Sequence, residues 1–329
     1  MYSGYSVSGR FAPPRTERAA AILASAAEAN TLCYFESENE AAQALSQPAQ
    51  KKALCACRIL FAGGVGKIYL LTMAELSQIE QKVGIGCIIT ENISDQNLQA
   101  LKSSVNESSK NRCERLLIVG ADTAAEALNA AGVINHERGI VCAPACKTQG
   151  DDNPRGLYAA CAMAARLLGE NDPVNNLSGA VMEDIAAASE LEENVVQNLI
   201  ANGVCVMESI ANRVECVRAV TTRTMHNGER DYSMRSVNTV LIIDDVMRTL
   251  RSGLALLVKG MRVGAASQAA IEAQATVLLA AKRDDGILES FSPPVVKADS
   301  SDPSVCSVEV SFNVAHVVEQ IHLSTQVRL

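Results

Sequence analysis

The stretch Val214–Gly260 reads VECVRAVTTRTMHNGERDYSMRSVNTVLIIDDVMRTLRSGLALLVKG, and its hydrophobic pattern changes partway along. In its first part, alternate residues share one face of an extended chain: Val214, Cys216, Arg218 and Val220. The segment Val204–Ile210 just before it is a second apolar run. Alternation and short apolar runs are typical of strands, so the pattern predicts strand followed by strand.

The second part of the stretch predicts a long helix. Met225–Asp231 is polar and contains the pair Asn227-Gly228, which favours a tight turn. Beyond Asn238, apolar residues recur at spacings of three and four: Ile243, Val246, Met247, Leu250, Leu254 and Leu257. Asn238 is the expected N-cap and Gly260 the expected stop.

Charged residues on this helix have spacings that suit local ion pairs. Asp244 and Arg248 stand at i and i+4, and Asp245 can reach the same arginine at i+3. Exposed pairs of this kind contribute only tenths of a kcal/mol. They therefore indicate a solvated or contact-making face and give no evidence of catalysis.

Upstream of residue 204, predicted strands alternate with predicted helices. The strands are Thr31–Phe35, Lys67–Thr72, Cys87–Thr90, Leu116–Val119 and Gly139–Cys142. The helices are Glu38–Leu45, Gln50–Leu60, Ser77–Val83, Ser94–Ser103, Thr123–Ala130, Pro154–Gly169 and Leu191–Asn202. Such alternation favours an α/β fold in which helices cover both faces of a mostly parallel sheet.

The order of elements in the last part of the chain resembles that of a known family. VRAVTT at 217–222, a polar insertion, the helix IDDVMRTLRSGL at 243–254, a second helix, GIL at 286–288 and terminal strands are similar to the C-terminal domain of contractile tail sheath proteins. These proteins occur in phages, phage-tail-like bacteriocins and contractile injection systems. Glu137-Arg138 with the following run Gly139–Ala143 resembles the middle region of the same family.

The resemblance implies a division into two domains and two arms. Residues 19–203 would form an α/β domain with a subtilisin-like mixed or parallel sheet, and residues 204–316 an α+β domain that faces an inner tube. A strand is implied at Ala19–Ala24, although its alanines favour helix by propensity. Residues 1–18 and 317–329 would be extended arms.

The arms are expected to exchange strands between neighbouring subunits. In the C-terminal arm one face of a predicted strand is formed by Ile321, Leu323, Thr325, Val327 and Leu329. In the N-terminal arm Tyr5 and Val7 belong to a short segment that could pair with a partner. Two other interpretations stay open, namely that the C-terminal strand pairs within its own subunit and that the N-terminal arm is a frayed tail.

Charge is unevenly distributed along the chain, whose net charge is −8. Residues 1–205 carry 16 Lys and Arg against 23 Asp and Glu, whereas residues 206–329 carry 13 against 14. The sequence contains no basic patch with aromatic residues on which bases could stack, so nucleic acid is not expected as a partner. If the nearly neutral domain faces the tube, as the resemblance implies, the candidate tube contacts are Lys259, Arg262, Lys282 and Arg283.

Eleven cysteines, an odd number among mostly apolar neighbours, favour reduced and buried thiols in the cytoplasm. Cys55/Cys57 and Cys142/Cys146 lack the spacing of a zinc site, so no metal is expected. Gly63–Lys67 resembles a phosphate loop but has Phe61 and Ile68 where that motif needs glycine and a hydroxyl residue, so no nucleotide or other cofactor is expected.

Catalysis is not expected either. Of the four histidines only His136 falls in the α/β part, and no serine, Ser178 included, stands in an elbow that would expose an oxyanion hole. An α/β hydrolase-like enzyme and a generic self-assembling shell protein remain the alternatives.

The predicted function is that of a contractile sheath subunit. The chain would polymerise helically around an inner tail tube, together with baseplate and terminator proteins, and contract to drive the tube through a target envelope. No run of the sequence is long enough to cross a bilayer. The protein is therefore expected in the bacterial cytoplasm during assembly and then in a phage tail or tail-like particle.

Overall fold

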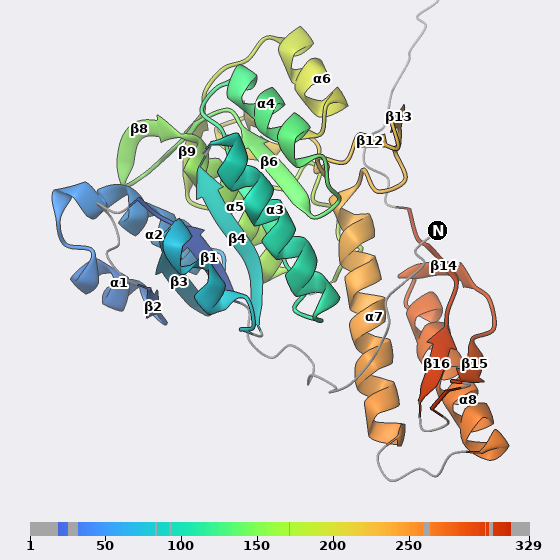
Figure 1. Cartoon of the computed structure of the whole chain (residues 1–329). Helices are drawn as coiled ribbons and strands as arrows, with labels where there is room; N and C mark the ends of the chain where they lie inside the picture. Colours follow the sequence, from blue (N-terminus) through green and yellow to red (C-terminus); the bar gives the residue numbers. More distant parts are fainter. Residues whose placement is uncertain are drawn as a thin grey trace, which may run out of the picture.

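The structure of the protein, a computed structural model, describes residues 19–25, 32–82, 84–91, 94–170, 172–258, 264–299, 301–302 and 305–316. The two expected arms lie outside these residues. Figure 1 shows a layered α/β part beside a smaller unit made of two long helices and short strands. None of the described helices is apolar over the length that a bilayer requires.

An eight-stranded sheet forms the centre of the larger part. Across the sheet the strands are β11 (Arg213–Cys216), β10 (Val204–Ile210), β6 (Gly139–Ala143), β5 (Leu116–Gly120), β4 (Ile85–Glu91), β1 (Ala19–Leu23), β3 (Lys67–Leu71) and β2 (Cys33–Phe35). The six inner strands run parallel, and one antiparallel strand lies at each edge. The predicted mixed α/β fold is therefore confirmed.

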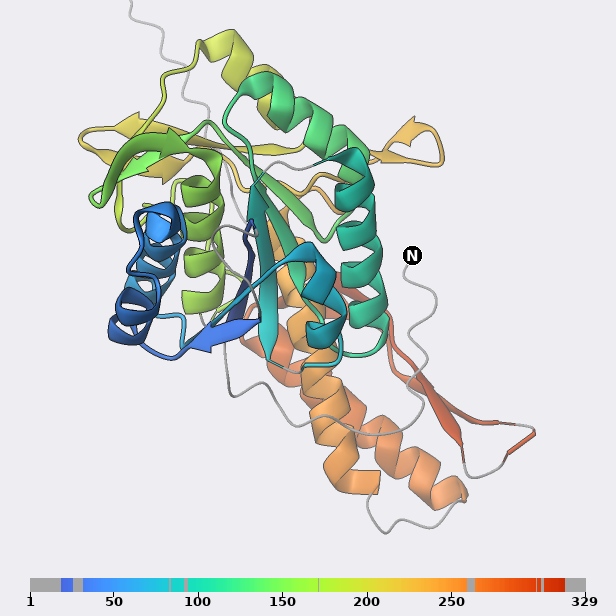
Figure 2. The ribbon, with the colours of Figure 1, turned by 60° about the vertical axis from the view of Figure 1, so that its left-hand side comes forward.

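Helices cover both faces of this sheet, as Figure 2 shows nearly edge-on. On one face α2 (Lys51–Ala62) and α5 (Gly156–Gly169) pack over a core cluster, with α1 (Glu38–Ala44) against α2. On the other face lie α3 (Asp95–Lys110), α4 (Ala124–Ile134) and α6 (Glu193–Ala201). Because both faces are covered, strands such as β5 are buried along their whole length and lack polar alternation.

Short elements complete the larger part. The helical turns η1 (Pro48–Gln50) and η2 (Met73–Ile79) are of the 3₁₀ type. A three-stranded sheet contains β7 (Cys146–Thr148), β8 (Asp151–Arg155) and β9 (Ile185–Ala188). The pair β12 (Met225–His226) and β13 (Glu229–Arg230) forms a hairpin around Asn227-Gly228, both with positive φ, which confirms the predicted turn.

The smaller unit has its own hydrophobic core, and we call it the C-terminal unit. It contains α7 (Val237–Val258), α8 (Ala265–Asp284), β14 (Leu288–Phe291), β15 (Val295–Ala298), β16 (Cys306–Glu309) and β17 (Phe312–Val314). Buried side chains of α7 recur at three- and four-residue spacing and meet α8: Ile242, Val246, Leu250, Leu254, Ile271, Ala275 and Leu279. The period-3.6 pattern thus correctly predicted the long helix.

The sheet continues past the expected domain boundary between residues 203 and 204. β10 begins at Val204 and pairs in parallel with β6, so that Cys205 lies beside Cys142. β11 then forms the antiparallel edge. The predicted strands after Gly203 therefore exist, but they extend the α/β sheet. The change to a separate core comes within α7, between Val240, which packs in the core of the larger part, and Ile242, which packs in the core of the C-terminal unit.

Three local predictions were wrong, each for a physical reason. The helix expected at Ser77–Val83 is replaced by η2, and buried Arg115 donates to the carbonyls of residues 79, 80 and 82. Asn238 is no N-cap, because it is buried and donates to Pro173 and Asn175 carbonyls. The α5 helix begins at Gly156 because Pro154 belongs to β8.

The segment Val308–Val314 alternates apolar and polar residues, a pattern that predicts one half-buried strand, but the structure divides it. Its apolar residues pack against the core of the C-terminal unit and its polar residues are exposed, as the alternation predicts. However, β16 pairs with β15, whereas β17 pairs with β14. Alternation identifies the buried face but does not identify the pairing partner.

Two glycines allow α5 to begin directly against the end of β5. A Cβ on Gly120 would overlap the carbonyl group of Gly156, which is backbone and cannot rotate away. The Asp122 carboxylate accepts a hydrogen bond from the Gly156 N–H at 2.6 Å and fixes the same approach. The backbone at Gly156 therefore lies directly against the carboxyl end of β5.

We predict that Gly120→Ala costs about 3 kcal/mol or more in the free energy of unfolding, because overpacking against backbone is not relieved by a rotamer change. Gly132→Ala is the matched control. Gly132 lies exposed in α4 with nothing within 4 Å of the place that a methyl group would take, and alanine there should add about 0.5–1 kcal/mol by helix propensity. Urea denaturation of both variants measures the difference, and equal midpoints would contradict the predicted overlap.

Candidate functional site

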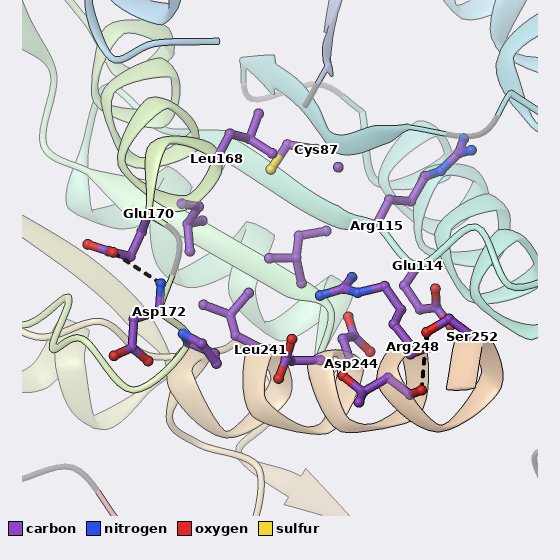
Figure 3. Close-up of a pocket in the computed structure, with 16 residues that line it drawn as sticks. Cys87, Glu114, Arg115, Leu168, Glu170, Asp172, Leu241, Asp244, Arg248 and Ser252 are labelled. Carbon is purple, nitrogen blue, oxygen red and sulfur yellow. Dashed lines mark hydrogen bonds between the residues drawn. The ribbon is translucent and has the colours of Figure 1, made fainter. Parts of the chain in front are cut away.

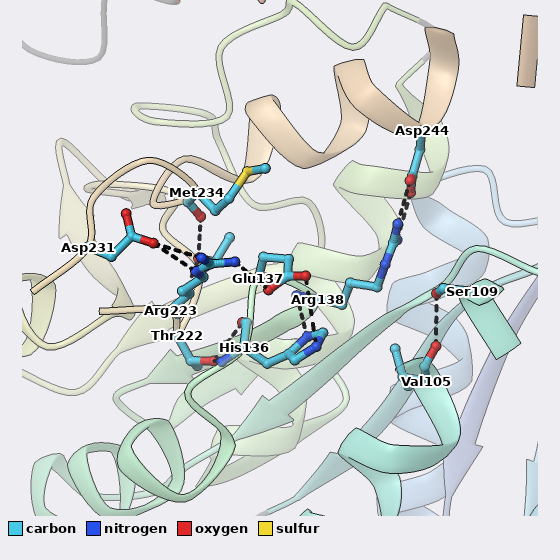
Figure 4. A network of polar contacts seen from close by, with 11 residues as sticks. Val105, Ser109, His136, Glu137, Arg138, Thr222, Arg223, Asp231, Met234 and Asp244 are labelled. Carbon is cyan, nitrogen blue, oxygen red and sulfur yellow. Dashed lines mark hydrogen bonds and ion pairs between the residues drawn. The ribbon is translucent and has the colours of Figure 1, made fainter. Parts of the chain in front are cut away.

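The α7 helix is joined to the amino ends of the parallel strands by a buried ion pair. Arg138 immediately precedes β6, and Asp244 lies in the second turn of α7. The guanidinium donates two hydrogen bonds to the two carboxylate oxygens at 2.8 and 2.6 Å. Only 4% of Arg138 and 5% of Asp244 is exposed. Figure 4 shows the two side chains pointing at each other between the helix and the sheet.

A second ion pair joins the same helix to the neighbouring strand with the opposite polarity. Glu114 precedes β5, and its carboxylate accepts a hydrogen bond from Arg251 of α7. Both side chains are nearly buried. The sheet thus contributes the cation Arg138 and the anion Glu114, and the helix contributes the complementary charges. We call these four residues the junction.

A pocket of about 280 Å³ lies between the two ion pairs, under α7. It is bounded by the amino ends of β4 and β5, by the end of α5 and by α7 (Figure 3). Its polar lining residues are Glu114, Arg115, Glu170, Asp172, Asp244, Asp245, Arg248, Thr249 and Ser252. Small-molecule sites of open α/β sheets lie at the carboxyl ends of the strands, whereas this pocket lies at their amino ends.

The local ion pairs predicted on α7 are replaced by longer-range pairs. Asp244 joins Arg138, and Asp245 joins Lys282 of α8 at 2.6 Å. The spacing correctly indicated that the two aspartates and Arg248 lie close together on the helix, but it did not predict their ion-pair partners. A helix packed on a sheet offers its carboxylates to cations far away in the sequence, and spacing alone does not detect them.

The structure describes two of the four candidate tube contacts. Lys282 is largely occupied within the subunit, because it pairs with Asp245 and is only 18% exposed. Arg283 is 49% exposed, pairs with the adjacent Asp284 and lies 5.7 Å from the Phe291 ring centre. Lys259 and Arg262 lie outside the described residues, as do all the candidates for strand exchange: Tyr5, Val7, Ile321, Leu323, Thr325, Val327 and Leu329.

The groups that a hydrolase would need have other contacts. Burial lowers the pKa of His136, against a raising effect of Glu137, and its Nδ1 accepts a hydrogen bond from the Arg138 N–H at 3.1 Å. Ser178 Oγ accepts from the Ala219 N–H at 3.0 Å. Within the described chain, no hydrogen bond joins the two residues.

His136 belongs to a polar network at the base of the β12–β13 hairpin, which Figure 4 shows. Its backbone N–H donates to Thr222 Oγ1, and that hydroxyl donates to the His136 carbonyl. Arg223 lies between two carboxylates, at 3.2 Å from Glu137 and 2.7 Å from Asp231. The network connects the hairpin to the loop between α4 and β6.

The cysteines of the two candidate pairs, Cys55/Cys57 and Cys142/Cys146, are buried. Burial raises the pKa of Cys57 and of Cys146 to about 12, and that of Cys142 well above its ordinary value. These thiols are therefore protonated near neutral pH and are weak nucleophiles. The Gly63–Lys67 turn packs on α5 through Gly63, and Lys67 pairs with Glu36 at 2.7 Å.

The sequence matches no family model and no curated protein. Its fold is similar to that of a chain in the structure of the anti-feeding prophage baseplate in contracted state, with 13% identity, coverage of 100% of this chain and 98% of that chain, and a TM-score of 0.74. A chain in the contracted sheath complex of an extracellular contractile injection system is 12% identical, with coverage of 99% of this chain and 97% of that chain and a TM-score of 0.72. The sheath tail protein from Desulfitobacterium hafniense is 8% identical, with coverage of 100% of both chains and a TM-score of 0.70.

The chain therefore has the fold of contractile sheath proteins, and these matches cover 99% or more of it. The fold that the sequence resemblance implied is confirmed. The subtilisin-like description of the sheet, the arms and the individual contact residues stay predictions. The motifs quoted from the sequence contain Arg138, Asp244 and Arg251, but no sequence pattern indicated which residues pair across the junction.

We predict that Asp244→Asn destabilises the protein by about 3–5 kcal/mol, because it removes the charged carboxylate that accepts two hydrogen bonds from the buried Arg138 guanidinium. The double variant Arg138→Met with Asp244→Leu should lose much less, since it removes both charges. The control is Lys297→Ala in the exposed pair with Glu309, where the expected loss is under about 1 kcal/mol. Guanidinium denaturation measures the free energy of unfolding of each variant. A double variant as unstable as Asp244→Asn would contradict the explanation by a buried charge.

We also predict that protonation of His136 destabilises the fold. Because burial lowers its pKa in the native state, the unfolded chain binds a proton first as the pH falls below about 6.5. The free energy of unfolding should then decrease from pH 7 toward pH 5. His136→Asn keeps an acceptor for the Arg138 N–H and cannot titrate, so its decrease should be shallower. Parallel slopes for the two proteins in urea denaturation would exclude this role for His136.

Proposed function

We propose that the chain is a structural subunit of a contractile tail sheath. It polymerises helically around an inner tube, and the polymer shortens to drive the tube through a target envelope. The observation that carries this proposal is the full-length similarity of fold to chains from contracted sheath assemblies, with 97% or more of each chain covered.

The C-terminal unit offers places where neighbouring subunits could be joined. Among the described residues, β14 pairs with β17 alone and β15 with β16 alone, so each of the two small sheets has unpaired edges. An unpaired edge binds an extended segment through main-chain hydrogen bonds. We assign this role to the arms, with Tyr5 and Val7 at one end of the chain and the apolar face Ile321–Leu329 at the other.

The C-terminal unit is also the surface that we assign to the inner tube. Of the described candidates, Arg283 has the larger exposed fraction and is the better positioned for a tube carboxylate, whereas Lys282 stabilises the contact between α7 and α8. Baseplate and terminator proteins would bind the ends of the polymer. Assembly would take place in the bacterial cytoplasm, before the sheath works as part of a tail-like particle.

We propose no enzymatic activity for the chain. His136 and Ser178 have the hydrogen bonds described above, and the first residue of α5 lies directly against the carboxyl end of β5, the end of a strand where an open α/β sheet binds a substrate. A sheath needs no bound cofactor for its work, because the energy comes from the difference between two packings of the same subunit.

Negative-stain electron microscopy of the purified chain tests this function. Regular hollow tubes are expected, whereas discrete small oligomers would favour an enzyme and closed shells would favour a generic shell protein. A hydrolytic rate in the wild-type protein that disappears in His136→Ala or Ser178→Ala would contradict the structural role.

We predict that deleting residues 317–329 leaves a soluble subunit with an unchanged melting temperature that forms no tubes. The reason is that an exchanged strand contributes to the neighbour and not to its own core. Deleting residues 1–9 should act in the same way. Lysine at both Leu323 and Val327 should reproduce the loss, while lysine at His322 and Gln326, on the other face, is the matched control.

The opposite result has a distinct signature. If the strand packs in its own subunit, its deletion removes five buried side chains and exposes the apolar sheet face beneath them. That loss costs several kcal/mol, at about 25 cal/mol per Å² of buried apolar surface. The truncated subunit would then melt well below the full-length protein and aggregate. Regular tubes from the truncated protein would rule out strand exchange.

A further inference from the structure

Arg248 is the one guanidinium in the wall of the pocket under α7 for which the described chain shows no ion pair and no backbone acceptor. The two carboxylates at the right helical spacing are already occupied, Asp244 by Arg138 and Asp245 by Lys282. Arg248 is half-buried, so its charge is partly removed from water without a protein counter-charge among the described residues. Figure 3 shows its guanidinium reaching from α7 toward the middle of the pocket.

The other charges of the wall largely cancel. Glu114 pairs with Arg251, and Glu170 pairs with Arg166 at 3.3 Å. Arg115 is buried and donates to backbone carbonyls of the η2 region, so it is not directed at a ligand. Asp172 Oδ1 accepts a hydrogen bond from the Val174 N–H at 3.0 Å. Within the part of the chain that the structure describes, the pocket therefore presents one uncommitted cation, with carboxylates at its rim.

This arrangement selects the ligand by charge and shape. A singly charged carboxylate matches one guanidinium and can accept two parallel hydrogen bonds from it. A phosphate carries close to two negative charges and would be repelled by the carboxylates at the rim. The wall also has apolar members, which suit the short carbon stem of an aspartate or glutamate: Leu116, Leu167, Leu168, Pro173 and Leu241.

We propose that the Arg248 pocket binds the carboxylate of an acidic side chain from a second copy of this chain. A single guanidinium contact contributes too little to hold a free small carboxylate. In a polymer the same contact is repeated at every subunit and adds to the others. The chain supplies suitable donors, since residues 1–205 carry seven more acidic than basic side chains. The proposal rests on the proposed function for its second copy.

The test compares Arg248 variants in self-association, followed by sedimentation and by negative-stain microscopy at several protein concentrations. Arg248→Gln should raise the concentration needed for assembly roughly tenfold, as expected for an interfacial charge pair that loses one partner. Arg248→Lys should retain part of the affinity, and Arg248→Glu should be the weakest because it repels the carboxylate. Lys110→Gln, an exposed single-charge change on α3, should assemble like the wild type.

Several outcomes would overturn the proposal. They are assembly of Arg248→Gln at the wild-type concentration, or a fall in its melting temperature large enough to explain the loss of assembly. Saturable binding of sodium glutarate to the isolated wild-type subunit, absent in Arg248→Gln, combined with normal assembly of that variant, would assign the pocket to a free carboxylate.

The failure of this proposal is separable from the failure of the proposed function. Wild-type tubes that also form with Arg248→Gln contradict the pocket alone. Discrete wild-type oligomers that depend on Arg248 contradict the sheath but support the pocket. A wild-type protein that stays monomeric under all conditions contradicts both.

Discussion

The buried pair of Arg138 and Asp244 determines where the C-terminal unit sits on the sheet. Moving a charge out of water costs several kcal/mol, and the cost is offset only where geometry and hydrogen bonding are good. Here both carboxylate oxygens accept hydrogen bonds from one guanidinium. The partners are 106 positions apart in the chain, so the contact links the start of β6 directly to α7. Other placements of the helix would leave at least one of these charges buried and unpaired.

The second pair, Glu114 with Arg251, makes this placement specific as well as stable. Because its polarity is reversed, a helix shifted along the sheet edge would bring like charges together. The sheet and the C-terminal unit should consequently behave as one body. In a sleeve that shortens, the change would then occur at the contacts between subunits, as in other assemblies that alternate between two packings of rigid parts.

Sequence patterns predicted the helices and strands but did not predict which strands pair or which charged residues form ion pairs. Alternating strands and helices indicated the parallel sheet, and the three-and-four spacing indicated α7, because these periods reflect which side of an element is buried. The division of Val308–Val314 between two sheets and the transfer of Asp244 to Arg138 were missed, because both depend on segments distant in sequence. The candidates for strand exchange lie outside the described residues, so the sequence prediction stands alone there.

The two edge strands of the large sheet bear on how such a protein avoids aggregation. β2 is three residues long, and its neighbour β3 begins with Lys67, which pairs with Glu36. At the other edge, β11 carries the charged pair Arg213 and Glu215. Short and charged edges disfavour strand-to-strand stacking of the amyloid type. In a protein that assembles in many copies, the edges of the largest sheet are thereby protected from aggregation. Aggregation through this sheet then does not compete with the specific contacts between subunits.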